Sequence, residues 1–167
     1  MDGSKIVEKL KAEHPDSVTA VGSHAGQSWV ETDRGRILDL LRHLKEDPEL
    51  AFDCLMDLTA VDYLNQGAPE RYCVVYNLYS FPNNTYFRVK VWVPEEDPLI
   101  DSAAGLWRSA PWAEREVYDL YGIEFEGHPG LQRLMLPEYY TGHPLRKDYP
   151  LTGMGERDNF PKHERGS

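Results

Sequence analysis

The sequence is poor in cysteine, and this scarcity excludes several chemistries. Only Cys54 and Cys73 occur among 167 residues, and they form no CxxC pair. An iron–sulfur cluster usually requires four thiolates, so this chain cannot hold one alone. Both cysteines lie in strand-like apolar runs, where a free cysteine behaves as a small core residue. A disulfide is the alternative, and it is uncommon in a cytosolic chain.

Long apolar runs and a positive net charge are also missing. No run approaches the roughly 20 apolar residues that span a bilayer. The formal charge of −10 argues against general nucleic-acid binding through phosphate neutralisation. Residues 1–16 lack the apolar centre of a secretory signal and the Arg- and Ser-rich character of a transit peptide. Neither GxGxxG nor GxxxxGK[ST] occurs, so a nucleotide site has no support. We expect a chain made and kept in a bacterial-type cytoplasm.

The composition that is present indicates one globular domain. A length of 167 residues corresponds to about one domain, and a hydrophobic fraction of 41% is enough for one core. Apolar spacing predicts the elements. Helices are predicted over 4–14 and from Asp33 to before Pro48, and strands over 18–21, 27–32, 52–64, 72–79 and 85–93. Their order predicts an α+β fold: a mainly antiparallel sheet with helices on one face, then a short helix and a long extended C-terminal strap.

The short helix is predicted between Pro111 and Gly122. Proline suits the first turn of a helix, and glycine suits the position just after its end. Glu116 and Asp119 lie three residues apart on this helix. Paired acids could perform acid–base work or bind a metal ion. We favour the commoner alternatives, a solvated helix face or partners for arginine.

Residues 128–167 have an unusual composition. They contain five of the 12 prolines together with many apolar and aromatic side chains. Only Leu131–Leu136 is predicted as a short strand. Aromatic side chains on a proline-stiffened segment suit docking, because proline reduces the entropy that ordering costs. We therefore expect residues 1–127 to form the α+β domain and residues 128–167 to form an extended segment that docks on a partner protein.

The tripeptide Gly-His-Pro occurs twice and suggests a catalytic or metal-binding histidine pair. In both copies proline follows the histidine, and no third ligand stands at a recognisable zinc spacing. We therefore favour turn-stabilising or interface roles for His128 and His143. A small enzyme that uses these histidines with Glu116 and Asp119 is the alternative from a different functional class.

The strongest signal is a series of motifs between residues 114 and 150. It consists of Glu114-Arg115-Glu116-x-x-Asp119, Gly122-Ile123, Phe125-x-Gly127-His128-Pro129, Arg133-Leu134-Met135-Leu136-Pro137 and Gly142-His143-Pro144-Leu145-Arg146-Lys147-Asp148-Tyr149-Pro150. In order and spacing this series resembles the 30-kDa subunit of the proton-translocating NADH:quinone oxidoreductase known as respiratory complex I.

The resemblance implies a non-catalytic subunit of the peripheral arm. Such a subunit scaffolds the transfer of electrons from NADH to quinone, coupled to proton translocation, and holds no cofactor itself. FMN and the iron–sulfur clusters are then expected in partner subunits. The implied partners are the quinone-site 49-kDa-type and terminal-cluster 20-kDa-type subunits. The implied location is the cytoplasmic side of the bacterial inner membrane, reached through the complex. Membrane-bound hydrogenases and other quinone- or ferredoxin-linked oxidoreductases have equivalent subunits, so this alternative stays open.

The motif residues are therefore predicted to form a partner interface. Arginine binds carboxylates and backbone carbonyls well at interfaces, and tyrosine is a common interface anchor. No catalytic, cofactor-binding or metal-binding residue is predicted. The predicted interface residues are Glu114, Arg115, Glu116, Asp119, His128, Arg133, Tyr139, Tyr140, His143, Arg146, Lys147, Asp148 and Tyr149.

Overall fold

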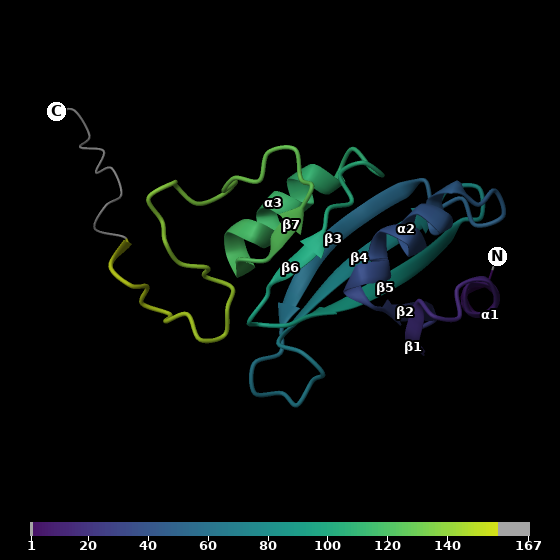
Figure 1. The fold of residues 1–167 in the computed structure, drawn as a ribbon, viewed down its shortest axis with the longest axis horizontal. Helices are drawn as coiled ribbons and strands as arrows, with labels where there is room; N and C mark the ends of the chain where they lie inside the picture. The colour runs from purple at the N-terminus through teal and green to yellow at the C-terminus, as the bar shows by residue number, and fades with distance from the viewer. Residues whose placement is uncertain (1, 157–167) are drawn as a thin grey trace.

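The computed structural model describes residues 2–156, and its ribbon is drawn in Figure 1. No helix within that range is both long and apolar enough to cross a membrane. The elements in chain order are α1 (Gly3–Glu13), β1 (Val18–His24), β2 (Gln27–Thr32), a 3₁₀ turn η1 (Arg34–Arg36), α2 (Ile37–Glu46), β3 (Cys54–Asp62), β4 (Tyr72–Ser80), β5 (Thr85–Val93), β6 (Leu99–Asp101), α3 (Ala110–Tyr121) and β7 (Glu124–Glu126).

The main sheet has five strands in the order β1-β2-β5-β4-β3. Only the β2–β5 pair is parallel, while β1–β2, β4–β5 and β3–β4 are antiparallel. Strands β6 and β7 form a separate parallel pair. The predicted mainly antiparallel α+β fold is confirmed. Figure 1 shows the strap, residues 128–156, in yellow-green, leaving the α3 end of the body, away from the N-terminus.

One face of the sheet is buried because apolar residues alternate along its strands. In β5 the buried side chains of Phe87, Val89, Val91 and Val93 alternate with more accessible ones. They belong to one cluster, to which α1, α2 and α3 all contribute. Because α2 buries one apolar stripe, its polar face remains outside. This cluster is the single core that the composition predicted.

Both cysteines are free, as the core interpretation predicts. Cys73 is buried in β4, and burial raises the pKa of its thiol to about 12. Cys54 is half-buried at the start of β3. The first hairpin also extends further than predicted. Strand β1 reaches His24, and only Ala25 and Gly26 turn the chain, both with positive φ.

Three short segments differ from the prediction. Strands β6 and β7 have three residues each, which is too short for a period of two to be recognised. The strand predicted over Leu131–Leu136 is wrong, because this segment is irregular. Its backbone N–H groups bind a carboxylate of α3 instead of a neighbouring strand.

Helix α3 begins and ends as its sequence predicts. Pro111 lies in its first turn, and Gly122 follows its last residue in the left-handed conformation with φ +74°. A Cβ atom on Gly122 would lie 2.5 Å from Nη2 of Arg146 and 2.6 Å from Nε2 of His143. Glycine is therefore required here twice, for its backbone conformation and for the close approach of the strap.

Replacing Gly122 with alanine is expected to destabilise the fold more than the left-handed backbone alone explains. The conformation costs about 1–2 kcal/mol and the overlap with the strap about 1–3 kcal/mol, which lowers the free energy of unfolding by roughly 2–5 kcal/mol. Gly127→Ala is the matched control, because Gly127 has φ +79° with nothing within 4 Å of the added Cβ. Urea unfolding measures both variants, and equal losses would contradict a tightly packed strap.

Candidate functional site

The carboxylate of Asp119 on α3 binds the beginning of the strap. Its side chain is fully buried. Oδ2 accepts hydrogen bonds from three successive backbone N–H groups, those of Leu134, Met135 and Leu136, at 3.0, 2.7 and 2.9 Å. Oδ1 accepts one from Nη1 of Arg133 at 2.7 Å. Three consecutive N–H groups can converge on one oxygen only if the chain curves around it, and this curvature excludes a strand.

These four donors also keep Asp119 charged. Burial alone would raise the pKa of this carboxyl group, but the backbone N–H groups and Arg133 outweigh it and hold the pKa below its usual value. The prediction that the acids of this helix act as partners for arginine is confirmed for Asp119. The alternative of a solvated face holds for Glu116, which is exposed.

Arg115 holds the same segment from the other side. Its Nε donates to the carbonyl of Gln132 at 3.0 Å, and its Nη2 donates to the carbonyl of Arg133 at 2.9 Å. The guanidinium also lies over the ring of Trp112, 5.2 Å from its centroid. Arg115 therefore binds backbone carbonyls, as predicted for an arginine of this region, but these carbonyls belong to its own chain.

The second Gly-His-Pro segment caps the C-terminal end of α3. The last carbonyls of a helix have no donor within the helix, and its C-terminal end favours positive charge. Here the carbonyl of Leu120 accepts from the backbone N–H of Leu145 at 3.1 Å. The carbonyl of Tyr121 accepts from Nε of Arg146 at 2.6 Å. The strap thus supplies the donors that this helix end lacks.

His143 completes this cap as a neutral side chain. Its Nδ1 lies 3.0 Å from the carbonyl oxygen of Asp119, which can only accept, so Nδ1 carries the proton and donates. Burial lowers the pKa of His143, and the nearby Arg146 lowers it further. A neutral imidazole with a proton on Nδ1 is therefore the form that fits this position.

A third contact fastens the strap to the sheet through Arg71. This side chain is 5% exposed and binds three carboxylates. Nη2 lies 3.0 Å from Asp62 at the end of β3 and 2.7 Å from Asp148 on the strap, and Nη1 pairs with Glu95. Asp62 also accepts from the backbone N–H of Lys147 at 2.8 Å. Sequence reasoning missed Arg71 and Asp62, because neither belongs to a recognisable motif.

The first Gly-His-Pro segment lies near the opposite end of α3. Nε2 of His128 is 3.0 Å from the carbonyl of Pro111 and donates to it, while Nδ1 accepts from the N–H of Gly130 at 2.9 Å. In His128, Nε2 is therefore the donor and Nδ1 the acceptor. The two histidines stabilise turns at separate ends of one helix, as the favoured interpretation predicts, and they form no pair.

Glu114 is the second buried acid of α3. It accepts from the hydroxyl of Ser102 at 2.5 Å and from the N–H of Ala103 at 2.6 Å. Burial raises the pKa of its carboxyl group despite these donors. Glu114 therefore fixes the loop that precedes α3 and has no exposed surface for a partner to contact.

The predicted tyrosines divide between the inside and outside of the strap. Tyr140 is 9% exposed, and its hydroxyl contacts that of Tyr149. Tyr139 is 43% exposed. Several large apolar side chains are exposed on the strap. Its exposed large side chains are Leu134, Met135, Tyr139, Leu145, Leu151 and Met154.

Comparison with known protein families gives one clear match. The family described as respiratory-chain NADH dehydrogenase, 30 Kd subunit, matches residues 30–155. An NADH-quinone oxidoreductase subunit of Geobacter sulfurreducens is 45% identical over 152 residues, which cover 91% of this chain and 92% of that protein. NADH-quinone oxidoreductase subunit 5 of Thermus thermophilus is 47% identical over 133 residues, covering 75% of this chain and 63% of that protein.

Two solved structures share the fold. A trypsin-resistant fragment of Nqo5 has a TM-score of 0.69 and 38% identity, covering 78% of this chain and all of that chain. A chain of the membrane-bound sulfane sulfur reductase, an archaeal respiratory membrane complex, has a TM-score of 0.75 and covers 100% of this chain and 97% of its own. Its identity is 22%, so this second likeness concerns the fold alone.

Asp119→Asn is expected to lower the free energy of unfolding at pH 7 by about 2–4 kcal/mol. The neutral amide removes the negative charge that pairs with Arg133 and accepts hydrogen bonds from three backbone N–H groups. The folded-state pKa of Asp119 lies below the unfolded value of about 3.9. Its contribution is therefore complete above about pH 5 and is lost as the pH falls through the folded-state pKa. The difference between the two proteins should shrink in acid, as measured by urea unfolding at several pH values.

Glu116→Gln provides the control for this measurement. Glu116 lies on the same helix but is exposed, so its replacement should change the free energy of unfolding by no more than about 0.5 kcal/mol. A difference between wild type and Asp119→Asn that stays constant down to the lowest pH would contradict a charged, strap-binding carboxylate.

Proposed function

The chain belongs to the family of the respiratory-chain NADH dehydrogenase 30-kDa subunit, and from this premise we propose that it is a scaffold with no active site of its own. Its relatives are subunits of NADH-quinone oxidoreductase, so the chain is a subunit of an oxidoreductase complex of this kind. In that complex it would hold the cluster-bearing and quinone-site subunits in place while electrons pass from NADH to quinone, and this transfer is coupled to proton translocation.

The observation that carries the scaffold proposal is the use made of the motif residues. Catalysis requires acids, bases or nucleophiles that can reach a substrate. In residues 2–156 the carboxylate of Asp119 is surrounded by four donors, and both imidazoles are held at helix ends by backbone groups. The histidine and carboxylate enzyme considered as an alternative therefore lacks an assembled site in this part of the chain. These side chains hold the strap in place, and the strap provides the surface that we assign to partner binding.

The outer side of the strap is the part we assign to partner binding. It is already fixed to the body by Asp119, Arg146 and Arg71, so a partner would not need to order it first. A group of exposed apolar side chains on an ordered segment is typical of a protein–protein interface. The predicted interface residues that a partner could reach directly are the exposed Glu116, Tyr139, Lys147 and Asp148.

The buried residues among the predicted interface set would act by shaping this surface. Glu114, Asp119 and Tyr140 are buried, so their contribution to a partner is indirect. We propose that residues 1–127 form the body and that residues 128–167 form the docking segment. Residues 157–167 of the docking segment lie outside the described residues.

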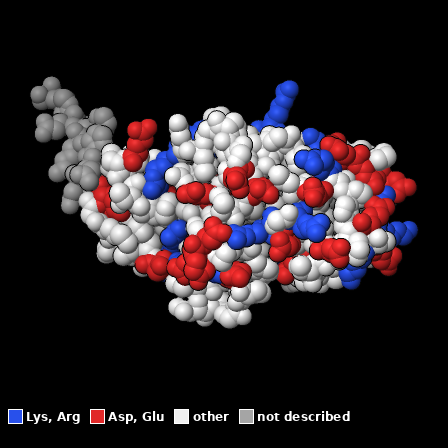
Figure 2. Space-filling model, in the orientation of Figure 1, with Lys and Arg blue, Asp and Glu red and all other residues white. Residues whose placement is uncertain are grey.

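The partners we propose are the 49-kDa-type and 20-kDa-type subunits of the same complex. FMN and the iron–sulfur clusters would lie in partner subunits. For the clusters this agrees with a chain that has only two cysteines, one of them buried. The complex would place the chain at the cytoplasmic face of the bacterial inner membrane. Charge is consistent with protein partners: Figure 2 shows acidic and basic side chains interspersed on the visible face without a continuous basic patch.

The scaffold proposal is tested by co-purification. We expect a tagged wild-type chain, co-expressed with the other subunits, to retain them on an affinity column. Leu151→Asp should reduce this retention about tenfold or more, because a charge would enter an apolar contact, a penalty of at least about 1.4 kcal/mol. The Leu151 side chain is fully exposed, so the stability of the isolated chain should not change. Quantitative mass spectrometry measures the retained subunits.

Met56→Asp serves as the control for this experiment. Met56 is 53% exposed on β3, away from the strap, so the variant should retain partners as the wild type does. The proposed docking surface is wrong if Leu151→Asp assembles normally, and the scaffold function is wrong if the wild-type chain retains no oxidoreductase subunit.

A further inference from the structure

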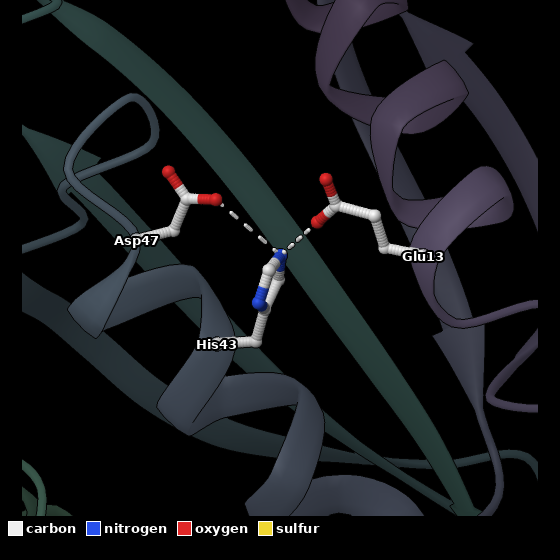
Figure 3. Close-up of side chains that lie close together, drawn as sticks. All are labelled: Glu13, His43 and Asp47. Carbon is white, nitrogen blue, oxygen red and sulfur yellow. Dashed lines mark ion pairs between the residues drawn. The ribbon is translucent and has the colours of Figure 1, made fainter.

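Three potential metal ligands meet where the ends of α1 and α2 approach each other, far from the strap. Glu13 is the last residue of α1, His43 lies in the last turn of α2, and Asp47 directly follows α2. Figure 3 shows the imidazole between the two carboxylates. Its Nε2 atom lies 2.8 Å from Oε2 of Glu13 and 3.8 Å from Oδ2 of Asp47. The three ligand atoms lie within 4.8 Å of one another.

Nε2 of His43 faces two carboxylates. This atom is inaccessible to solvent and makes no hydrogen bond of good geometry to any group that the structure describes, although Oε2 of Glu13 lies 2.8 Å away. A neutral imidazole whose Nε2 carries a lone pair would point that lone pair at two carboxylates, which repels. The repulsion becomes attraction when Nε2 carries a proton or binds a metal ion. Nε2 therefore suits either a proton, which it donates to Glu13, or a bound metal ion.

Two helix ends add to this preference. The C-terminal end of a helix carries a partial negative charge, and both α1 and α2 end at this cluster. Lys9 is attracted by the same negative charges. Its Nζ lies 2.8 Å from Oδ2 of Asp47 and 2.5 Å from Oε2 of Glu49. The ammonium group of Lys9 thus occupies part of the position that a metal ion would take, and it would compete with one.

The ligand types and their spacing select the ion. One imidazole with two carboxylates suits zinc and similar transition metals, whereas calcium and magnesium prefer sites made of oxygen alone. Ligands about 2.0–2.2 Å from a tetrahedral zinc ion lie roughly 3.3–3.6 Å apart. The observed distances of 2.8 and 3.8 Å lie on either side of this value. A small rotation of Glu13, whose side chain is 44% exposed, can lengthen the shorter distance toward this value.

A neighbouring histidine supports the orientation of this ligand. The ring of His14 packs edge-on against the ring of His43, with centroids 4.5 Å apart. His14 directly follows α1, so the contact comes from the same helix end that carries Glu13. Such packing restricts rotation of the His43 imidazole and keeps Nε2 directed at the carboxylates. Groups behind a metal ligand that fix its orientation are typical of built metal sites.

We propose that Glu13, His43 and Asp47 form a site for one divalent transition-metal ion of the zinc type, with water as the fourth ligand. The ion would displace the ammonium group of Lys9 from Asp47 and fasten the C-terminal end of α1 to α2. The ion would stabilise the fold, because it would cross-link two helices that are separated by a hairpin in the sequence, at a position away from the strap. The proposal does not depend on the function assigned to the strap.

Titration of the full-length, chelator-treated chain with ZnCl₂ in a calorimeter tests this site. We expect one zinc ion to bind and the thermal unfolding temperature to rise with zinc concentration. His43→Ala should weaken zinc binding by at least about 10- to 100-fold. Loss of a residue that only orients a ligand has an effect of that size, and loss of the ligand itself should have no smaller effect. Lys9→Met should strengthen binding, because it removes the competing ammonium group. MgCl₂ should give no binding in the same range.

His24→Ala is the matched control, because His24 is exposed at the end of β1 and distant in sequence from the ligands. It should bind zinc as the wild type does. Asp47→Asn provides a second test if His43→Ala does not fold, and it should also weaken binding. The proposal is overturned if neither the wild-type chain nor Lys9→Met binds zinc with one-to-one stoichiometry. It is equally overturned if His43→Ala and Asp47→Asn bind zinc as tightly as His24→Ala.

Discussion

The buried carboxylate of Asp119 determines the path of the chain after α3. A charged group without solvent is costly unless donors surround it, and this chain has placed those donors on its own strap. Because the donors are consecutive backbone N–H groups, the requirement acts on the conformation of the strap and not only on its position. The segment must curve around one oxygen atom. This curve sets the direction in which the rest of the strap continues.

The end of α3 imposes the second requirement. Its last carbonyls need donors, and the segment Gly142–Pro150 brings them as a backbone N–H, an imidazole and a guanidinium. Gly122 leaves the room in which these groups lie, and Arg71 then joins the far side of the segment to the sheet. A stretch too polar and too rich in proline for a core helix or strand is suited to this task. It satisfies polar groups that the core cannot satisfy.

Sequence reasoning succeeded where the determinants are local. A few neighbouring residues define these elements: tyrosines and valines along Tyr72–Ser80 and Thr85–Val93, and Pro111 and Gly122 at the ends of α3. It failed over Leu131–Leu136, whose apolar residues resemble a strand but whose N–H groups bind a residue 15–17 positions earlier. Arg71 and Asp148 are 77 positions apart in the sequence, and no pattern within either segment predicts that they pair. The motif series identified the region that matters, while only the structure shows which of its atoms face inward.

This division between inward and outward atoms explains how one segment can serve two purposes. Residues that bind α3 and the sheet are polar or charged and are satisfied within the chain, so exposing them to a partner would break existing contacts. Leucine, methionine and tyrosine side chains remain outside beside polar ones, and these apolar side chains gain by being covered. A partner that covers them meets a surface whose backbone is already positioned. The strap therefore has little to gain from rearranging on binding, and the buried acid that fixes its curve also fixes the shape it presents to the complex.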